Sequence, residues 1–278
     1  MNFIDTLLSA DFPFLRNALL AGLLSSVLFG TIGAVVTVRH IASLAGAVSH
    51  AVLGGIGLAL YLSVTGIVPG LPPIAGALAF AVLAALVIGI VTLRAKQRED
   101  TAISAIWAIG MSLGVLFMAK TPGYTDPSTW LFGSILLVST SDLLLLAALD
   151  IIVVFLARRF YAQIEAVSFD EEFARVRGIR FELVFFVILA VTAVAIVLLQ
   201  TFVGIVMVIA MLTLPSGCSG VFSRSLGGMM LLSVIFSMAF SVCGVAAGWV
   251  FDLPVGAMTV IIAGAVFLLI SLFKRRIS

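Results

Sequence analysis

Nine long, mostly apolar stretches dominate this chain of 278 residues. A helix needs about 20 apolar residues to cross the hydrocarbon core of a bilayer. Transmembrane strands would be about ten residues long and would alternate apolar and polar side chains, and these stretches do neither. We therefore predict an all-α, polytopic transmembrane helical bundle of about 8–9 spans. The stretches cover roughly residues 18–38, 43–64, 71–93, 101–119, 131–157, 181–199, 203–222, 226–250 and 254–273.

The composition excludes several other classes of protein. Hydrophobic residues make up 63% of the chain and charged residues 10%, whereas a soluble domain has about 45–50% and about 25%. This leaves no material for a large extramembrane domain or a nucleic-acid-binding module. We predict one transmembrane domain over residues 1–278, in contact with membrane lipid and with no nucleic-acid partner. The two cysteines, Cys218 and Cys243, lie in apolar stretches and do not form a disulfide scaffold.

The basic residues predict the orientation. With nine spans and an outer N-terminus, thirteen Lys and Arg residues fall on one side and only Arg16 and Lys120 on the other. Cytoplasmic loops carry the excess of positive charge, so we predict a cytoplasmic C-terminus. Trp130 and Trp249 then lie near the outer interface, where amphipathic aromatic rings are favoured.

The longest polar stretch contains the signals of a short helix. Ser168 is followed three residues later by Glu171, which is the pattern of a capping box. Acidic residues fill the first turn and Arg175 lies in the last, an order that suits the helix dipole, and Gly178 suits the position after the helix end. The pattern predicts a short cytoplasmic helix near residues 168–178.

One face of this predicted helix is apolar. Phe169, Phe173 and Val176 are spaced at i, i+4 and i+7, which places them on one side of a helix. Such a face can lie on the bilayer surface or dock into a groove of a cytosolic protein, and the sequence leaves both open. The residues that we assign to this docking segment are Ser168, Phe169, Asp170, Glu171, Glu172, Phe173, Arg175 and Gly178.

The chain lacks its own phosphate-binding loop for ATP. The loop requires a Gly-Lys pair, and none of the three lysines follows a glycine. If the chain belongs to a pump, a separate subunit must supply ATP hydrolysis, and we do not predict an enzyme. The alternative enzyme is a rhomboid-like intramembrane serine protease, because Gly217-Cys218-Ser219-Gly220 matches G-x-S-G. A serine nucleophile needs a nearby base, and the only histidines, His40 and His50, lie far upstream.

Six short motifs occur along the chain in a fixed order. Together they resemble the permease family of bacterial ATP-binding-cassette (ABC) importers for zinc, manganese and iron. The motifs are the run Val38–Gly55 (VRHIASLAGAVSHAVLGG), Glu99–Ile103, Leu131–Ser134, Phe169–Ala174 with Gly178, Val203-Gly204 followed by Pro215, and Leu253–Gly256.

The resemblance implies a multi-pass permease of the bacterial cytoplasmic (inner) membrane. It implies a cytosolic ATP-binding subunit, an extracytoplasmic solute-binding protein, and either a homodimer or a pair of related permeases. It also implies that the segment near residues 168–178 is the coupling helix on which the ATP-binding subunit acts. The expected cargo is a divalent metal ion, zinc or manganese and also iron, and no tightly bound cofactor is expected.

One departure from the family concerns the cargo. Members usually read Gly-Asp-Ala-Leu-Ser-His, and Gly46 stands where that Asp would be, four residues before His50. An Asp and a His four residues apart share one helix face and could together bind a borderline cation. Because only the histidine remains, a chelated metal or another small solute stays open as the cargo.

Two ionisable residues lie at similar predicted depth inside spans. His50 lies about 12 Å and Asp150 about 10 Å from the cytoplasmic ends of their spans, at 1.5 Å per residue. Ionisable residues at such depth usually face a cavity or a partner, so His50 and Asp150 are the candidate metal ligands. Each could instead serve packing alone. The other candidate residues of a translocation path are Ser49, Met207, Met211 and Cys218.

Overall fold

The computed structural model describes residues 12–94, 99–123, 135 and 138–274. Every regular element in these ranges is a helix, apart from one 3₁₀ residue. The helices are α2 (Pro13–Val38), α3 (Ala42–Val64), α4 (Pro73–Arg94), α5 (Glu99–Lys120), α7 (Thr140–Arg159), α8 (Tyr161–Phe169), α9 (Glu171–Val176), α10 (Phe181–Val203), α11 (Ile205–Phe222), α12 (Leu226–Phe251) and α13 (Val255–Lys274).

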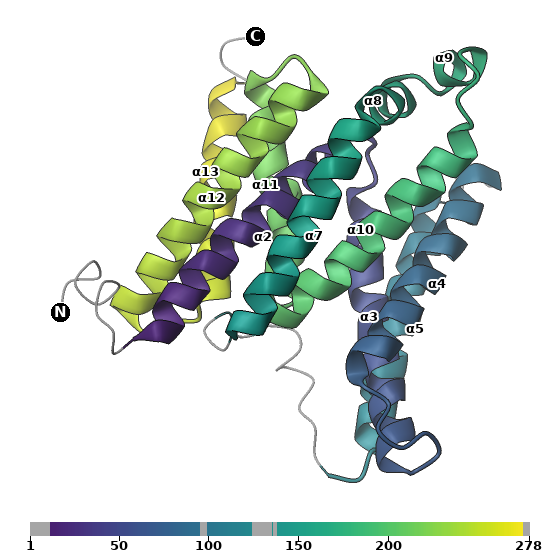
Figure 1. Ribbon diagram of the computed structural model, residues 1–278, viewed down its shortest axis with the longest axis vertical. Helices are drawn as coiled ribbons and strands as arrows, with labels where there is room; N and C mark the ends of the chain where they lie inside the picture. Colours follow the sequence, from purple (N-terminus) through teal and green to yellow (C-terminus); the bar gives the residue numbers. More distant parts are fainter. Residues whose placement is uncertain (1–11, 95–98, 124–134, 136–137, 275–278) are drawn as a thin grey trace.

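The predicted all-α bundle is confirmed. Among the described residues, nine helices are long and apolar enough to cross a membrane. They run side by side in Figure 1, while the short helices α8 and α9 lie together at one end of the bundle. The C-terminal end of α13 lies at that same end, and the connection between α3 and α4 lies at the opposite one. This arrangement agrees with the predicted topology, which puts the polar segment and the C-terminus on one side.

One predicted boundary is wrong. The apolar stretch beginning at residue 131 predicted a span from there, but α7 begins at Thr140. Ser139 is its N-cap: Asp142 donates its backbone N–H to Ser139 Oγ at 3.3 Å, and the Ser139 N–H is donated to Asp142 Oδ2 at 3.0 Å. This reciprocal cap satisfies two backbone groups at the start of the helix. Residues 131–134 lie outside the described residues.

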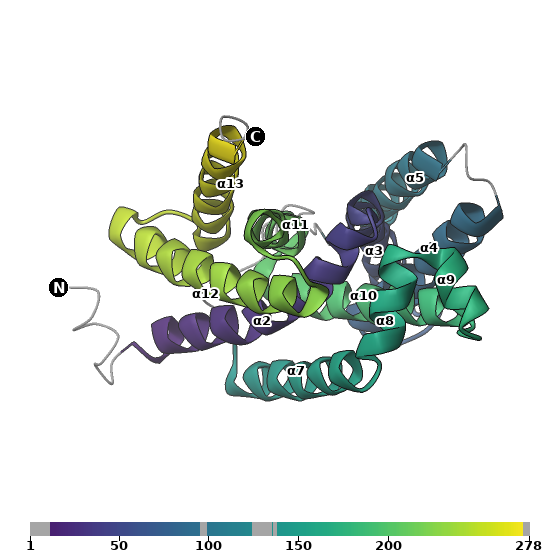
Figure 2. The same ribbon diagram turned by 90° about the horizontal axis from the view of Figure 1, so that it is seen from above.

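Helices α2 and α3 are the two centres of the packing. Helix α2 contacts α12, α11 and α7, and α3 is packed mainly between α4 and α5. Seen along the bundle, α5 and α13 reach one flank and α7 lies on the other (Figure 2). Helix α10 contacts α4 and α3 and is followed by α11 after a single residue, Gly204. The backbone of Gly204 has a φ of 83°, a conformation that favours glycine. This residue therefore allows two spans to follow each other so closely.

Close backbone contacts hold α3 between its neighbours. A Cβ built on Gly55 would lie 2.1 Å from the carbonyl oxygen of Gly76 on α4, and one on Gly110 of α5 would lie 2.4 Å from Ala51 Cα. Without a hydrophobic driving force between helices in lipid, such small-residue contacts supply the packing attraction. They position α3, which carries His50.

Candidate functional site

The polar segment forms two short helices instead of one. Helix α8 ends at Phe169, and α9 runs from Glu171 to Val176. Asp170 is the N-cap of α9, and its Oδ1 accepts the backbone N–H of Phe173 at 2.9 Å. The predicted capping box is therefore wrong, because Ser168 lies inside α8. Aspartate is as good an N-cap as serine, and the extended backbone of Asp170, with ψ 105°, separates the two helices.

The predicted end of the segment is confirmed. Gly178 has φ 76°. Its N–H is donated to the carbonyl of Arg175, and the N–H of Ile179 is donated to the carbonyl of Ala174, both at 3.0 Å. These two bonds form a Schellman motif, which satisfies the last carbonyls of a helix and requires a left-handed residue after it.

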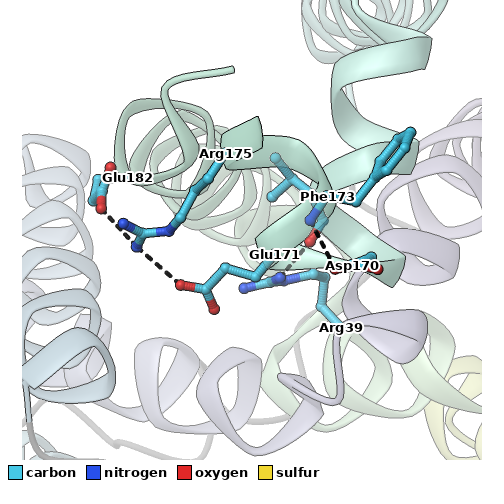
Figure 3. Close-up of polar contacts among 7 residues, drawn as sticks. Arg39, Asp170, Glu171, Phe173, Arg175 and Glu182 are labelled. Atoms are coloured by element: carbon cyan, nitrogen blue, oxygen red, sulfur yellow. Dashed lines mark hydrogen bonds and ion pairs between the residues drawn. The ribbon is translucent and has the colours of Figure 1, made fainter. Parts of the chain in front are cut away.

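A network of charges joins α9 to α10. Arg175 Nη2 lies 3.0 Å from Glu171 Oε1 and 2.7 Å from Glu182 Oε1 (Figure 3). The hydrogen bond to Glu171 is the largest cause that raises the pKa of Arg175, because it stabilises the charged guanidinium. The network orients α9 relative to the first turn of α10.

The apolar residues of the segment are exposed. Phe169 ends α8, while Phe173 and Val176 belong to α9, and their exposed fractions are 63%, 48% and 87%. Arg177 Cζ lies 5.0 Å from the centroid of the Phe173 ring. Exposed apolar side chains rimmed by charges are typical of a protein–protein contact surface. We call Phe169, Phe173 and Val176 the apolar patch.

The guanidinium of Arg39 binds α8 to α2. Sequence reasoning missed this contact. Arg39, just after α2, donates a hydrogen bond from Nη1 to the carbonyl of Val167 near the end of α8. Its Cζ also lies 5.3 Å from the ring centroid of Phe181 and 4.9 Å from that of Phe185, both on α10. Cation–π contacts of this kind are attractive. Arg39 therefore holds α2, α8 and α10 together at one end of the bundle.

A phenol ties the segment to α12. Tyr161 Oη donates to Glu165 Oε1 at 2.8 Å and accepts the backbone N–H of Gly227 at 3.0 Å. The Gly227 N–H is one of those at the start of α12 that lack an intrahelical partner. Burial is the main cause that raises the pKa of Tyr161, and the Glu165 hydrogen bond acts in the same sense. The sequence separation of 66 residues between Tyr161 and Gly227 hides this contact from local sequence patterns.

His50 lies against α5. Its ring stacks on Trp107, with ring centroids 4.7 Å apart and 15° between the planes. His50 Nδ1 has no hydrogen-bond partner in the part of the chain that the structure describes. The neighbouring Ser49 is buried, and its Oγ donates to the carbonyl of Ala45 at 2.9 Å. A ring nitrogen without a partner can coordinate a metal, whereas Ser49 is satisfied within its own helix.

Asp150 lies on α7, among a different set of helices. Its side chain is buried, and neither carboxylate oxygen has a hydrogen-bond partner among the described residues. Helix α7 packs mainly on α2, whereas α3 packs on α4 and α5. No hydrogen bond joins Asp150 to His50 within the described chain, so these two candidate ligands are not a bonded pair.

The remaining candidate residues lie on α11. Met207, Met211 and Cys218 are all buried, where α11 packs on α13, α2 and α12. Ser219, the nucleophile of the protease alternative, bonds to Ser233 Oγ at 2.7 Å and to the carbonyl of Ser216 at 2.9 Å. Neither partner is a base, so the geometry does not support the protease reading.

Comparison with known proteins identifies the family. A family model described as the ABC 3 transport family matches residues 11–274 of the chain. The chain belongs to this family. It is therefore a multi-pass membrane permease of an ABC transport system, a transport component rather than an enzyme.

Relatives of this ABC 3 permease match it over nearly their whole length. A protein of Chlamydia muridarum named "Probable metal transport system membrane protein" is 34% identical over 99% of this chain and 94% of its own. The manganese transport system membrane protein MntC of Listeria monocytogenes is 30% identical, over 99% and 95%. The solved structure of PsaBC from Streptococcus pneumoniae in complex with Fab superposes with a TM-score of 0.83 at 29% identity, over 96% and 94%.

Proposed function

We propose that this permease imports a divalent metal ion, with manganese as the first candidate and zinc and iron as the others. The observation that carries the proposal is the end-to-end similarity to proteins named for manganese transport. The proposed partners are a cytosolic ATP-binding subunit, an extracytoplasmic solute-binding protein, and a second permease, either a copy of this chain or a relative.

The apolar patch supports a docking site for the ATP-binding subunit. Phe169, Phe173 and Val176 are exposed at the end of the bundle where the polar segment lies. Arg39 and Tyr161 fix α8 to α2 and α12, so a force applied to this segment reaches two spans. We assign the coupling role to the end of α8 together with α9, from Ser168 to Gly178.

A double substitution tests the docking site. Phe169→Asp with Phe173→Asp should release the ATP-binding subunit in mild detergent, because two carboxylates would be buried in an apolar contact. The matched control is Phe222→Asp at the end of α11, where the phenylalanine is similarly exposed. If the double variant keeps its ATPase partner and its substrate-stimulated hydrolysis, α8 and α9 are not the docking site.

His50 is the residue of the transport path that the geometry favours. Among the described residues its Nδ1 lacks a hydrogen-bond partner, and its ring stacks on Trp107, whose exposed fraction is 47%. The site therefore borders the exposed face of α5, where a second permease could enclose a path. Gly46, one turn earlier on the same helix, has no described atom within 4 Å of a built Cβ, so a side chain at this position would have open space on the same helix face as His50.

Uptake of ⁵⁴Mn by cells that express the complete transporter tests this assignment. His50→Ala should abolish uptake while the protein still reaches the membrane, and Asp150→Ala should do so only if α7 contributes to the path. Gly46→Asp adds a carboxylate on the His50 face and should tighten metal binding and slow release, since a conduit must bind weakly enough to let go. Normal uptake by His50→Ala would refute the path and favour a chelated metal or another solute.

A further inference from the structure

A deep apolar cavity of about 410 Å³ lies between α2, α7, α8 and α10. Its walls include Val35 on α2, Val153 and Ala157 on α7, and Val184 and Val187 on α10. On α10 and the turn before it, the lining residues extend from Ile179 to Thr192, which is about 20 Å at 1.5 Å per residue. The hydrocarbon core of a bilayer is about 30 Å thick. The cavity therefore covers the depth of one leaflet.

The end of the cavity near α8 is polar and basic. Gln163 of α8 and Arg180 line it there, and Arg158 and Arg159 end the adjoining helix α7. No acidic residue lines the cavity among the described residues. The ion pairs seen in the described chain involve Arg175, so none of them neutralises Arg180. The cavity thus combines a long apolar shaft with a positively charged mouth.

The shape limits what can fill the cavity. Water is disfavoured in an apolar shaft without polar partners. A single acyl chain is long, narrow and apolar, and it enters directly from the surrounding leaflet. Anionic lipid headgroups are attracted to basic residues at the cytoplasmic surface.

We propose that this cavity is a binding site for one anionic phospholipid of the cytoplasmic leaflet. One acyl chain fills the shaft between α7 and α10, and the headgroup phosphate pairs with Arg180 and accepts a hydrogen bond from Gln163. Gly178 and Ile179, which connect α9 to α10, also line the cavity. The bound lipid therefore supports the segment that carries the apolar patch from the membrane side.

Photocrosslinking in vesicles tests the proposal with the assembled transporter. The probes are phosphatidylglycerol and phosphatidylcholine, each with a diazirine in one acyl chain, and the labelled peptides are identified by mass spectrometry. Phosphatidylglycerol should label the cavity-lining residues of α7 and α10 about fivefold more than phosphatidylcholine does, the factor expected for one basic residue at the surface.

Two pairs of variants separate the shaft from the charged mouth. Ala157→Phe fills the shaft and should abolish labelling of α10 inside the cavity, whereas Val154→Phe, on the exposed side of the same helix, should not. Arg180→Gln should lower phosphatidylglycerol labelling to the phosphatidylcholine level, whereas Arg224→Gln, at the turn before α12, should leave it unchanged. Arg180 is exposed, so its variant keeps the test valid if Ala157→Phe fails to fold.

Equal labelling by the two lipids, unchanged in Arg180→Gln, would overturn the proposal, because the site would not recognise the anionic headgroup. Labelling restricted to the outer surface of α7 would also overturn it, since a partner subunit would then cover the cavity. Neither result bears on metal uptake, so this proposal and the transport assignment can fail separately.

Discussion

Removing the Arg39 guanidinium should loosen helices α8 and α9 without unfolding the bundle. Arg39 binds the carbonyl of Val167 and stacks on Phe181 and Phe185. Arg39→Gln removes the charge, the reach to α8 and both ring contacts. The substitution lies at the end of α2, outside the buried core of the bundle, so its effect should be confined to α8, α9 and the α2–α3 joint.

The structure sets the size of the effect. A hydrogen bond from a charged donor contributes about 1.5–3 kcal/mol, and the lower end applies because Arg39 is only partly buried. The two cation–π contacts add about 0.5–1 kcal/mol each at sites of this exposure. The sum, about 2.5–3.5 kcal/mol, corresponds to roughly a 60- to 300-fold increase in the local opening of α8 and α9, since 1.4 kcal/mol is tenfold.

Hydrogen exchange measures this opening directly. Amides of residues 167–177 should exchange roughly 60- to 300-fold faster in Arg39→Gln, while amides in the middle of α10 and α12 should keep their rates. Arg39→Lys keeps the charge and should fall between the variant and the wild type. In the same preparations, the ratio of transported metal to hydrolysed ATP should fall in Arg39→Gln, because the ATPase would move a segment that no longer moves α2.

Two results would refute this reasoning. Unchanged exchange at residues 167–177 would mean that Arg39 does not hold α8. Faster exchange over the whole bundle, together with an equal increase in exchange in Arg224→Gln, would mean that losing any positive charge destabilises the protein in general.

Three further outcomes are expected. Tyr161→Phe should lower the stability of the α8–α12 contact by about 1 kcal/mol. Burial raises the pKa of Tyr161, so this contact should persist through neutral pH. It should be lost only in alkaline solution, as the pH rises through that pKa. Loss of the contact near neutral pH would contradict the assignment. In a cysteine-free background, Val68→Cys should react with an impermeant thiol reagent in intact cells and Gln163→Cys should not. The reverse pattern would contradict the predicted topology. Gly55→Ala places a Cβ 2.1 Å from a carbonyl oxygen of α4 and should cost about 1–3 kcal/mol, whereas Gly264→Ala, with nothing within 4 Å, should have little effect on the melting temperature.

The spans could be predicted because their cause is local. About twenty apolar residues suffice to satisfy the bilayer, so Phe181 and Leu226 were recognisable as the first residues of spans, where α10 and α12 begin. The predicted start of α7 was wrong because hydropathy does not mark the residue at which a helix begins. The start of α7 depends on the capping bonds of Ser139, and hydropathy does not register them.

In the polar segment at residues 168–178, two local signals for the start of a helix compete. Ser168 and Asp170 are both good N-cap residues, each with an acidic residue soon after it, and the sequence pattern favoured Ser168. In the structure Ser168 continues α8, because that helix is held at one end by Tyr161 and at the other by Arg39 through Val167. These partners lie 66 and 128 residues away along the chain, so no local pattern could have found them. Gly178 was predictable because a left-handed residue after a helix depends only on its neighbours.

At His50, too, the local features could be predicted from the sequence and the long-range contacts could not. Its presence inside a span was readable from the sequence, and so was the missing carboxylate at Gly46. Its stacking on Trp107 depends on α5 packing closely against α3 through Gly110 and Gly114. A stripe of small residues predicts that some helix approaches closely, but it does not say which one. The aromatic partner of the imidazole therefore could not be assigned before the fold was known.

The joint between α2 and α3 connects α8 to His50, the candidate residue of the transport path. Arg39 precedes α3 by three residues, and the N–H of Ile41 is donated to the carbonyl of Val36 at 3.0 Å across His40, whose φ is 56°. This bond makes the joint a closed turn, so the end of α2 and the start of α3 move together. His50 lies eight residues further along α3, about 12 Å at 1.5 Å per residue. If the ATP-binding subunit displaces α8, as we propose, the displacement has a short, hydrogen-bonded route to His50. Contiguity alone does not establish coupling. The ratio of transport to hydrolysis in Arg39→Gln supplies that evidence, because the substitution breaks the route at a single residue and leaves both ends intact.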